Sequence, residues 1–310
     1  MEKRAGSLTN PRFVGVACAI AATGLGLAYM AAAGAPPVYL AVNALALVLG
    51  LAFLGVMPGS AGRMPSLLGV GLLASGGLLL ATALFGVSVE GASRWMSIAG
   101  LNLQISLVVV PAMLVAFARR RDLLSTLGVM LAAVALALQP DRAMAGVLAL
   151  SLAVLAVHRR DRWMISALGV ATAGFVATLL RPDRLPAVPY VDQIFYTAFE
   201  VHALAGLAVV SGALLLVVPA ISGVRADPEN RDVYAVFGLA WLCIAVAAAL
   251  GNYPTPLVGY GGSSVLGYAL SLAFLPGKAR SAASAEGRAE HAAPAEGDRG
   301  SDLRIGIAYA

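Results

Sequence analysis

Long apolar stretches alternate with short polar segments along most of the chain. Their lengths, up to about 25 residues, are those that α-helices need to cross the hydrocarbon core of a bilayer. The pattern predicts ten helices, at residues 13–34, 38–57, 65–86, 101–118, 123–138, 143–157, 163–180, 194–218, 232–250 and 257–275. We therefore predict an all-α fold for residues 1–276, a polytopic membrane helix bundle of about ten transmembrane helices.

Residues 277–310 differ from the rest of the chain in composition. They are rich in Ala, Ser, Glu, Gly and Arg, with five acidic and five basic side chains. Such a segment buries too little apolar surface to offset the entropy of ordering it. We expect a disordered tail with no core to join.

The overall composition agrees with a membrane protein. Hydrophobic residues make up 60% of the 310 residues and charged residues only 12%, about half the usual charged share of soluble domains. The net charge is +5, but the basic residues form short clusters between apolar stretches, so nucleic acid is not an expected partner. The two cysteines, Cys18 and Cys243, each lie in an apolar stretch and predict neither a disulfide framework nor a zinc site.

The distribution of basic residues predicts the orientation. If the N-terminus is cytoplasmic, 17 of the 21 Lys and Arg residues lie in cytoplasmic segments. The remaining four, on the outward side, are Arg94, Arg142, Arg181 and Arg184. Because cytoplasmic loops carry the excess of positive charge, we predict that both termini are cytoplasmic.

The outward side also carries the carboxylates that are candidates for chemistry. These are Glu90, Asp141, Asp183, Asp192 and Glu200. They could pair with the outward arginines and only fix the loops, or they could bind an anionic head group and retain a base. Asp192 precedes the eighth predicted helix, where it could act as a helix cap. Glu200 lies about 12 Å further along that helix, inside an apolar stretch.

Four motifs occur in order on this side. Gly91-Ala92-Ser93-Arg94-Trp95 is followed by Gln104 and Ser106, and Gln139-Pro140-Asp141 forms a turn between two helices. Taken singly, an Arg beside a Trp can be a membrane anchor, and Asp141 can be a helix cap.

Two further motifs complete the series. Val191-Asp192-Gln193-Ile194-Phe195 precedes Glu200, and Pro256-Leu257-Val258-Gly259-Tyr260-Gly261-Gly262-Ser263-Ser264 opens the tenth predicted helix. The four motifs together resemble those of the SEDS (FtsW/RodA/SpoVE) family, polytopic glycosyltransferases of bacterial cell-wall synthesis. The resemblance extends from about residue 13 to residue 275.

The resemblance implies a peptidoglycan glycosyltransferase of the bacterial cytoplasmic membrane. Such an enzyme polymerises lipid II on the outer side of the membrane, in cell division or cell-shape maintenance, with a class B penicillin-binding transpeptidase as partner. Asp192 matches the family's essential aspartate and is the expected general base. Arg94, assisted by Arg181, Arg184 or a divalent cation such as Mg or Mn, is expected to stabilise the departing diphosphate. The other expected substrate-binding residues are Gln104, Ser106, Asp141, Glu200, Tyr260, Ser263 and Ser264.

The sequence also departs from the family pattern. Ile105, Leu107 and Val110 replace a Pro, a Glu and a Lys, and Val201 replaces a second Glu. The loop before Asp192 is short and lacks the family's glycine-rich motif. Two alternatives therefore stay open: a flippase for lipid II, and a catalytically silent scaffold for a transpeptidase.

Overall fold

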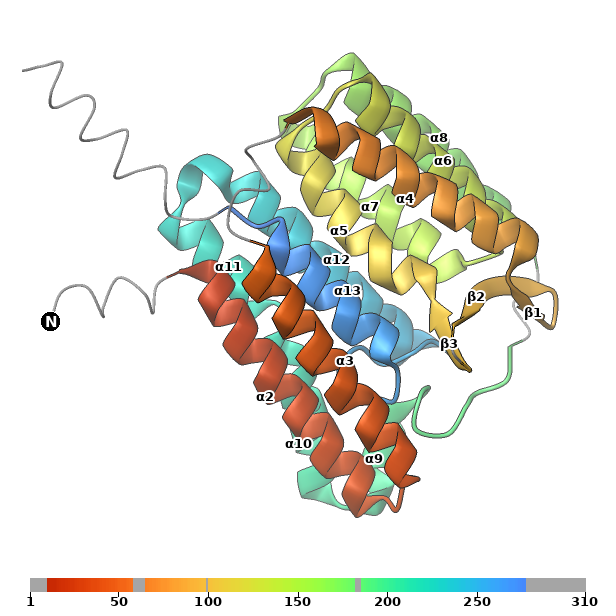
Figure 1. Cartoon of the computed structure of the whole chain (residues 1–310), viewed down its shortest axis with the longest axis vertical. Helices are drawn as coiled ribbons and strands as arrows, with labels where there is room; N and C mark the ends of the chain where they lie inside the picture. Colours follow the sequence, from red (N-terminus) through yellow and green to blue (C-terminus); the bar gives the residue numbers. More distant parts are fainter. Residues whose placement is uncertain (1–9, 58–64, 99, 182–184, 277–310) are drawn as a thin grey trace, which may run out of the picture. The chain divides into compact units, whose positions relative to one another are not determined.

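The computed structural model describes residues 10–57, 65–98, 100–181 and 185–276, and most of them are helical (Figure 1). The predicted tail, residues 277–310, lies outside the described residues. The α-helices of the described part are α2 (Pro11–Ala32), α3 (Pro37–Val56), α4 (Pro65–Phe85), α5 (Ile105–Arg119), α6 (Leu123–Leu138), α7 (Arg142–His158), α8 (Arg162–Leu179), α9 (Ile194–Val201), α10 (Ala203–Leu215), α11 (Val218–Ala226), α12 (Arg231–Leu250) and α13 (Gly262–Ala273). The prediction of a polytopic helix bundle is confirmed.

Six helical stretches in the described residues are long and apolar enough to cross a membrane. They are Pro11–Ala32, Pro37–Val56, Leu67–Phe85, Arg162–Leu179, Ala203–Ala226 and Pro228–Leu250. Helices α5, α6, α7 and α13 are apolar but shorter. The count of ten transmembrane spans stays a prediction.

The eighth predicted helix, residues 194–218, is not continuous. It is broken at His202, whose backbone is extended (φ −169°, ψ 147°), and again between α10 and α11. The imidazole Nδ1 of His202 accepts a hydrogen bond from the backbone N–H of Leu204 (3.1 Å) and so caps α10. A polar side chain that bonds the local backbone in this way competes with helix continuation, and the apolar pattern alone did not reveal it.

The sequence pattern also did not predict a small antiparallel sheet between α4 and α5. It consists of β1 (Val87–Val89), β2 (Ala92–Ile98) and β3 (Leu101–Gln104), in the order β1-β2-β3. Glycines with positive φ form the turns, Gly91 (82°) between β1 and β2 and Gly100 (81°) between β2 and β3. Trp95 pairs with Gln104 across β2 and β3, so the sheet places β2 beside the start of α5.

Helices α5, α12 and α13 form the centre of the core. Helix α13 packs against α5 and α3, as its position in Figure 1 also shows. Phe117, Trp241 and Tyr268 are fully buried. The two polar groups among these rings are satisfied, since Trp241 Nε1 donates to Ser271 Oγ (3.1 Å) and the Tyr268 hydroxyl donates to the Leu216 carbonyl (3.1 Å).

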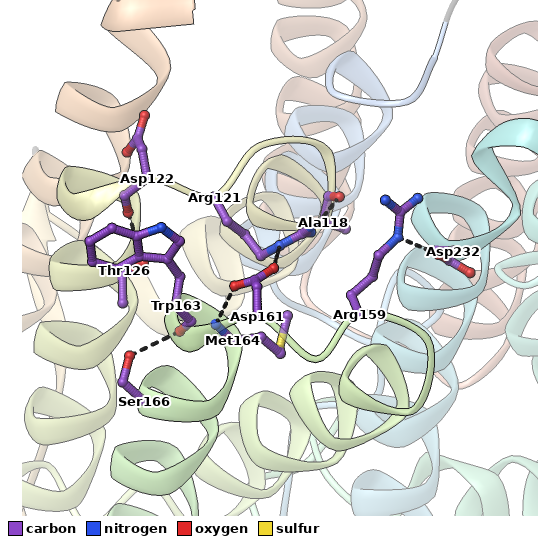
Figure 2. A network of polar contacts seen from close by, with 10 residues as sticks. All are labelled: Ala118, Arg121, Asp122, Thr126, Arg159, Asp161, Trp163, Met164, Ser166 and Asp232. Carbon is purple, nitrogen blue, oxygen red and sulfur yellow. Dashed lines mark hydrogen bonds and ion pairs between the residues drawn. The ribbon is translucent and has the colours of Figure 1, made fainter.

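The loops that are predicted to be cytoplasmic are held together by ion pairs (Figure 2). The guanidinium of Arg121 contacts the Asp161 carboxylate (2.9 Å), and that of Arg159 contacts Asp232 (3.1 Å). Asp161 also caps α8 by accepting from the Met164 N–H (2.9 Å). Burial would raise the pKa of Asp161, but the hydrogen bonds from Met164 and Arg121 outweigh it and hold the pKa below its usual value.

Candidate functional site

A buried cluster of polar side chains joins the sheet to three helices at the end opposite these ion pairs. The amide Nε2 of Gln104, the last residue of β3, donates to Asp141 Oδ2 (3.2 Å) and to the Tyr253 hydroxyl (2.9 Å). The Ser106 hydroxyl donates to the same Asp141 oxygen (2.7 Å). All four side chains are buried, so in this low-dielectric environment each hydrogen bond is stronger than it would be in water.

Asp141 connects this cluster to helix α7. Its other carboxylate oxygen, Oδ1, accepts from the backbone N–H of Met144 (3.2 Å), so Asp141 is the N-cap of α7. The side chain is fully buried. The predicted helix-cap role is therefore confirmed, but the cap also orients Gln104 and Ser106.

The cluster extends to α13 and to β2. The backbone N–H of Gln104 donates to Ser263 Oγ (2.9 Å), in the first turn of α13. The Arg94 side chain, 2% exposed, extends from β2 and donates from Nη2 to the Pro140 carbonyl (2.6 Å). A buried guanidinium near a buried carboxylate is an arrangement that often marks functional sites. Five predicted site residues thus lie together: Arg94, Gln104, Ser106, Asp141 and Ser263.

Tyr253 belongs to this cluster, although the sequence did not identify it. Burial and the Asp141 carboxylate raise the pKa of Tyr253 well above its usual value, so the group remains a neutral hydroxyl. Nothing in the sequence distinguishes Tyr253 as a site residue, because a tyrosine near a helix end at a membrane surface is common.

Asp192 lies in the loop that precedes α9. Its side chain is 8% exposed, and its Oδ2 accepts a hydrogen bond from the Val188 N–H (2.8 Å). Burial raises the pKa of Asp192, and the hydrogen bond from Val188 offsets this only in part. Asp192 differs from an ordinary helix cap, because the N-cap position of α9 is Gln193, whose φ is +58°. A carboxylate with a raised pKa accepts a proton more readily, as a general base must.

The segment between α12 and α13 connects Asp192 to the polar cluster. The Thr255 N–H donates to the Val191 carbonyl (2.9 Å), and the Tyr260 N–H donates to the Tyr190 carbonyl (2.6 Å). Tyr253, two residues before Thr255, reaches into the cluster. The loop that carries Asp192 and the buried polar cluster are therefore both hydrogen-bonded to residues 253–260.

Two side chains hold this stretch in its non-helical form. Asn43 of α3, which is fully buried, donates to the Gly259 carbonyl (2.7 Å) and accepts from the Gly261 N–H (3.0 Å). Ser264 Oγ accepts from the Leu257 N–H (3.2 Å). These bonds explain why α13 begins at Gly262 instead of residue 257. The role of Asn43 could not be inferred from its position in an apolar helix.

The buried polar atoms of this region that have no hydrogen-bond partner among the described residues include Gln104 Oε1 and Thr255 Oγ1. The contact of the Gln104 Nε2 with Asp141 fixes the orientation of the amide, since a flipped amide would place two acceptors together. Because buried polar groups are normally paired, a bound water or ligand is expected to complete the site at these atoms.

Among the described residues, Arg181 and Glu200 make no hydrogen bond with this cluster. Arg181 Nη1 donates to the carbonyl groups of Ala137 (3.3 Å) and Leu138 (3.4 Å) at the end of α6. Glu200 is exposed on α9. Arg184 lies outside the described residues. The substrate-binding roles of these residues stay predictions.

The side chains of the described part do not form a ready metal site. No group of three or more His, Cys, Asp or Glu side chains that could hold a metal ion occurs among the described residues. Asp141 already accepts from Ser106, Gln104 and Met144. The described residues therefore do not fit the divalent cation that the sequence resemblance implied.

Comparison with solved structures shows a known fold. The crystal structure of the rod shape determining protein RodA of Thermus thermophilus is similar over 84% of this chain and 94% of that chain, with a TM-score of 0.60 and 22% identity. An Asp-to-Ala variant of the same protein gives a TM-score of 0.59 and 23% identity, over 84% of this chain and 95% of that one. A chain of a peptidoglycan synthase complex, studied for its structural coordination of polymerisation and crosslinking, gives a TM-score of 0.55 and 23% identity, over 84% and 96% of the two chains.

Neither protein-family models nor curated protein sequences match this sequence. At these identities the likeness to solved structures establishes a RodA-like fold.

Proposed function

We propose that this protein is a divergent member of the SEDS family and a peptidoglycan glycosyltransferase that polymerises lipid II on the outer side of the bacterial cytoplasmic membrane. The observation that carries the proposal is the buried carboxylate of Asp192, held at the start of α9 in a RodA-like fold. The similar peptidoglycan synthase complex, which coordinates polymerisation and crosslinking, supports the same reaction class.

In the proposed reaction Asp192 acts as general base. It accepts the proton of the 4-hydroxyl of the acceptor sugar while that oxygen forms a bond to the anomeric carbon of the donor. The bond from this carbon to the undecaprenyl pyrophosphate breaks, and the diphosphate leaves with the electron pair. The raised pKa of Asp192 suits this role, because a carboxylate with a raised pKa is a stronger base than an ordinary aspartate.

The buried cluster is proposed to bind the diphosphate side of the donor. The guanidinium of Arg94 supplies a fixed positive charge close to where negative charge develops on the leaving group. The Pro140 carbonyl holds one end of the guanidinium in place (2.6 Å), which limits the reorganisation that charge stabilisation would require. Gln104 and Tyr253 offer further polar groups in the same low-dielectric region.

The proposed partner is a class B penicillin-binding transpeptidase, because glycan strands that are polymerised must also be crosslinked. The similar peptidoglycan synthase complex coordinates polymerisation and crosslinking. A role in cell division or in cell-shape maintenance follows from this partnership.

The direct test is polymerisation of fluorescently labelled lipid II by the purified full-length chain, alone and with a class B transpeptidase. We expect the wild-type protein to make glycan strands and Asp192→Asn to lose about 10²–10⁴-fold in rate. Glu90→Gln is the matched control, because Glu90 is an exposed carboxylate in the turn between β1 and β2. A wild-type protein without polymerase activity that still binds the transpeptidase would contradict the proposal and favour a scaffold. Transfer of lipid II across liposome membranes without polymerisation would favour a flippase.

A further inference from the structure

Three tyrosines from separate parts of the chain meet beside Asp192. Tyr39 lies in the first turn of α3, Tyr190 in the loop before α9, and Tyr260 in the stretch before α13. The rings of Tyr39 and Tyr260 are stacked, with centroids 3.8 Å apart and an interplanar angle of 10°. Tyr190 approaches the Tyr39 ring edge-on, at 6.1 Å and 76°. We refer to Tyr39, Tyr190 and Tyr260 as the tyrosine cluster.

The backbone fixes this cluster at a short distance from the proposed base. The Tyr260 N–H donates to the Tyr190 carbonyl (2.6 Å), and the Tyr190 hydroxyl donates to the Ala33 carbonyl (3.2 Å). Asp192 follows Tyr190 by two residues, so their Cα atoms are at most about 7 Å apart. The tyrosine cluster is therefore held by the same loop that carries Asp192.

All three tyrosines are partly exposed, and two of their hydroxyls are free to bind a ligand. The hydroxyls of Tyr39 and Tyr260 make no hydrogen bond to any of the described residues, and neither is a buried polar atom. Tyrosine rings at a membrane surface often serve only as anchors in the headgroup region. Such anchors, however, do not require rings from three segments to be stacked together and joined by hydrogen bonds to a loop that carries a buried acid.

The combination of flat apolar rings and free hydroxyls suits a saccharide. A pyranose ring has a face of C–H groups that packs on an aromatic ring, and a rim of hydroxyl and amide groups that pair with phenol hydroxyls. We propose that the tyrosine cluster binds the terminal sugar of the acceptor, so that its 4-hydroxyl is presented to Asp192. This inference rests on the proposed function and assigns Tyr39 and Tyr190, with Tyr260, to the acceptor side of the reaction.

The acceptor assignment follows from the position of the two polar regions. The Asp192 carboxylate takes the proton from the acceptor, so the surface next to it must hold the acceptor sugar. The donor diphosphate is proposed to bind at Arg94 and the buried cluster, which contains Tyr253. Among the described residues, no side-chain hydrogen bond joins that cluster to the tyrosine cluster. The tyrosine cluster contains no cationic side chain, which suits an uncharged sugar better than a diphosphate.

The test separates saccharide binding from catalysis. Binding of chitotetraose, a soluble oligomer of N-acetylglucosamine, is measured by isothermal titration calorimetry and saturation-transfer NMR on full-length Asp192→Asn in detergent, so that turnover does not contribute. We expect binding, weakened about 2- to 12-fold by Tyr39→Leu and by Tyr190→Leu, the range that one aromatic contact supplies. Tyr196→Leu is the control, because Tyr196 is a 59% exposed tyrosine on α9 whose hydroxyl donates to the Ala249 carbonyl.

The outcomes distinguish this inference from the proposed function. No binding of chitotetraose, equal affinities for all variants, or equal weakening by Tyr196→Leu would overturn the acceptor site even if the wild-type protein polymerises lipid II. Tyr39→Phe is a second variant that retains the ring. Tyr39→Phe should retain most of the binding. If the Tyr39→Leu protein does not fold, the affinities of Tyr39→Phe and Tyr190→Leu for chitotetraose still test the acceptor site. In active protein, Tyr39→Leu should raise KM for lipid II more than it lowers kcat.

Discussion

Asp141 and Asp192 are both buried aspartates, but their surroundings give them different capacities for chemistry. Asp141 accepts hydrogen bonds from Ser106, from Gln104 and from the Met144 backbone, so its charge is matched by donors. The Asp192 carboxylate accepts from the Val188 N–H alone among the described residues. A carboxylate with few donors is costly to ionise inside a protein. Asp192 is therefore the better proton acceptor, and Asp141 the better structural anchor.

This difference predicts how Asp192→Asn changes stability. The folded-state pKa of Asp192 is raised, so the folded protein binds its proton more tightly than the unfolded chain does, and ionisation above that pKa destabilises the fold. Asn keeps an acceptor for the Val188 N–H and removes the charge. We expect the melting temperature of Asp192→Asn in detergent at pH 7 to equal or exceed that of the wild type, while polymerase activity is lost. The gain should shrink as the pH falls below the folded-state pKa of Asp192 and vanish below the ordinary pKa of an aspartate in the unfolded chain. A lower melting temperature at pH 7 would contradict this account.

The opposite result is expected for Asp141→Asn. The amide could still cap α7, since Asn caps about as well as Asp. However, an Nδ2 group placed toward the Gln104 Nε2 and the Ser106 hydroxyl would leave buried donors without an acceptor. We expect a loss of about 1–3 kcal/mol in the free energy of unfolding, measured by thermal or denaturant unfolding in detergent.

Asp122→Asn provides the matched control for Asp141→Asn. Asp122 caps α6 by accepting from the Ser125 N–H (2.9 Å), but its side chain is partly exposed and, among the described residues, forms an ion pair with Arg120 alone. An exposed ion pair contributes about 0–1 kcal/mol. Equal losses for the two variants would show that the buried cluster around Asp141 adds nothing beyond a cap.

At the scale of elements, the helices were predictable and the connections that build the site were not. Apolar length identified the positions of α2 to α8 and α12, because those helices have a continuous apolar sequence. The pattern could not show that Leu257, with φ +62°, and the residues around it are held out of a helix by Asn43 and Ser264. The sheet was missed because its strands are short and contain polar residues. Asp192, Arg94 and Asp141 were found through motifs, whereas Tyr253 and the stacking of Tyr39 are visible only in three dimensions.

Close packing of α13 against α5 gives a prediction for one glycine. A Cβ added at Gly267 would lie 2.0 Å from the backbone carbonyl oxygen of Leu107, and backbone cannot move aside as a flexible side chain can. Glycine lets helices approach closely in membranes. We expect Gly267→Ala to lower the free energy of unfolding by about 1–3 kcal/mol or more, and to lower activity through displacement of Ser106 and Ser263. Gly77→Ala on α4 has open space around its added Cβ and should be near neutral. Similar melting temperatures for these two variants would contradict the packing argument.

At the scale of the whole molecule, the two ends of the bundle differ in chemistry. One end carries the ion pairs of Arg121 with Asp161 and of Arg159 with Asp232, all partly exposed (Figure 2). The other carries Asp192, the buried polar cluster and the tyrosine cluster. Exposed apolar side chains in the middle of α3, such as Leu45 (52%) and Val48 (61%), lie between the ends, as a lipid-facing surface requires. The chemistry is concentrated at one end, which suits an enzyme that acts on one membrane face.

The orientation of these ends is predicted by the distribution of basic residues and can be tested with single cysteines. Pro186 lies in the exposed loop before Asp192, and Arg160 is exposed in the loop between α7 and α8. In a background where Cys18 and Cys243 are replaced by Ala, a cysteine replacing Pro186 should react with a membrane-impermeant maleimide on intact spheroplasts. A cysteine replacing Arg160 should react only after the membrane is permeabilised, because positively charged loops remain cytoplasmic. The reverse labelling pattern would place Asp192 and the tyrosine cluster on the cytoplasmic side, where polymerisation of lipid II on the outer face could not take place.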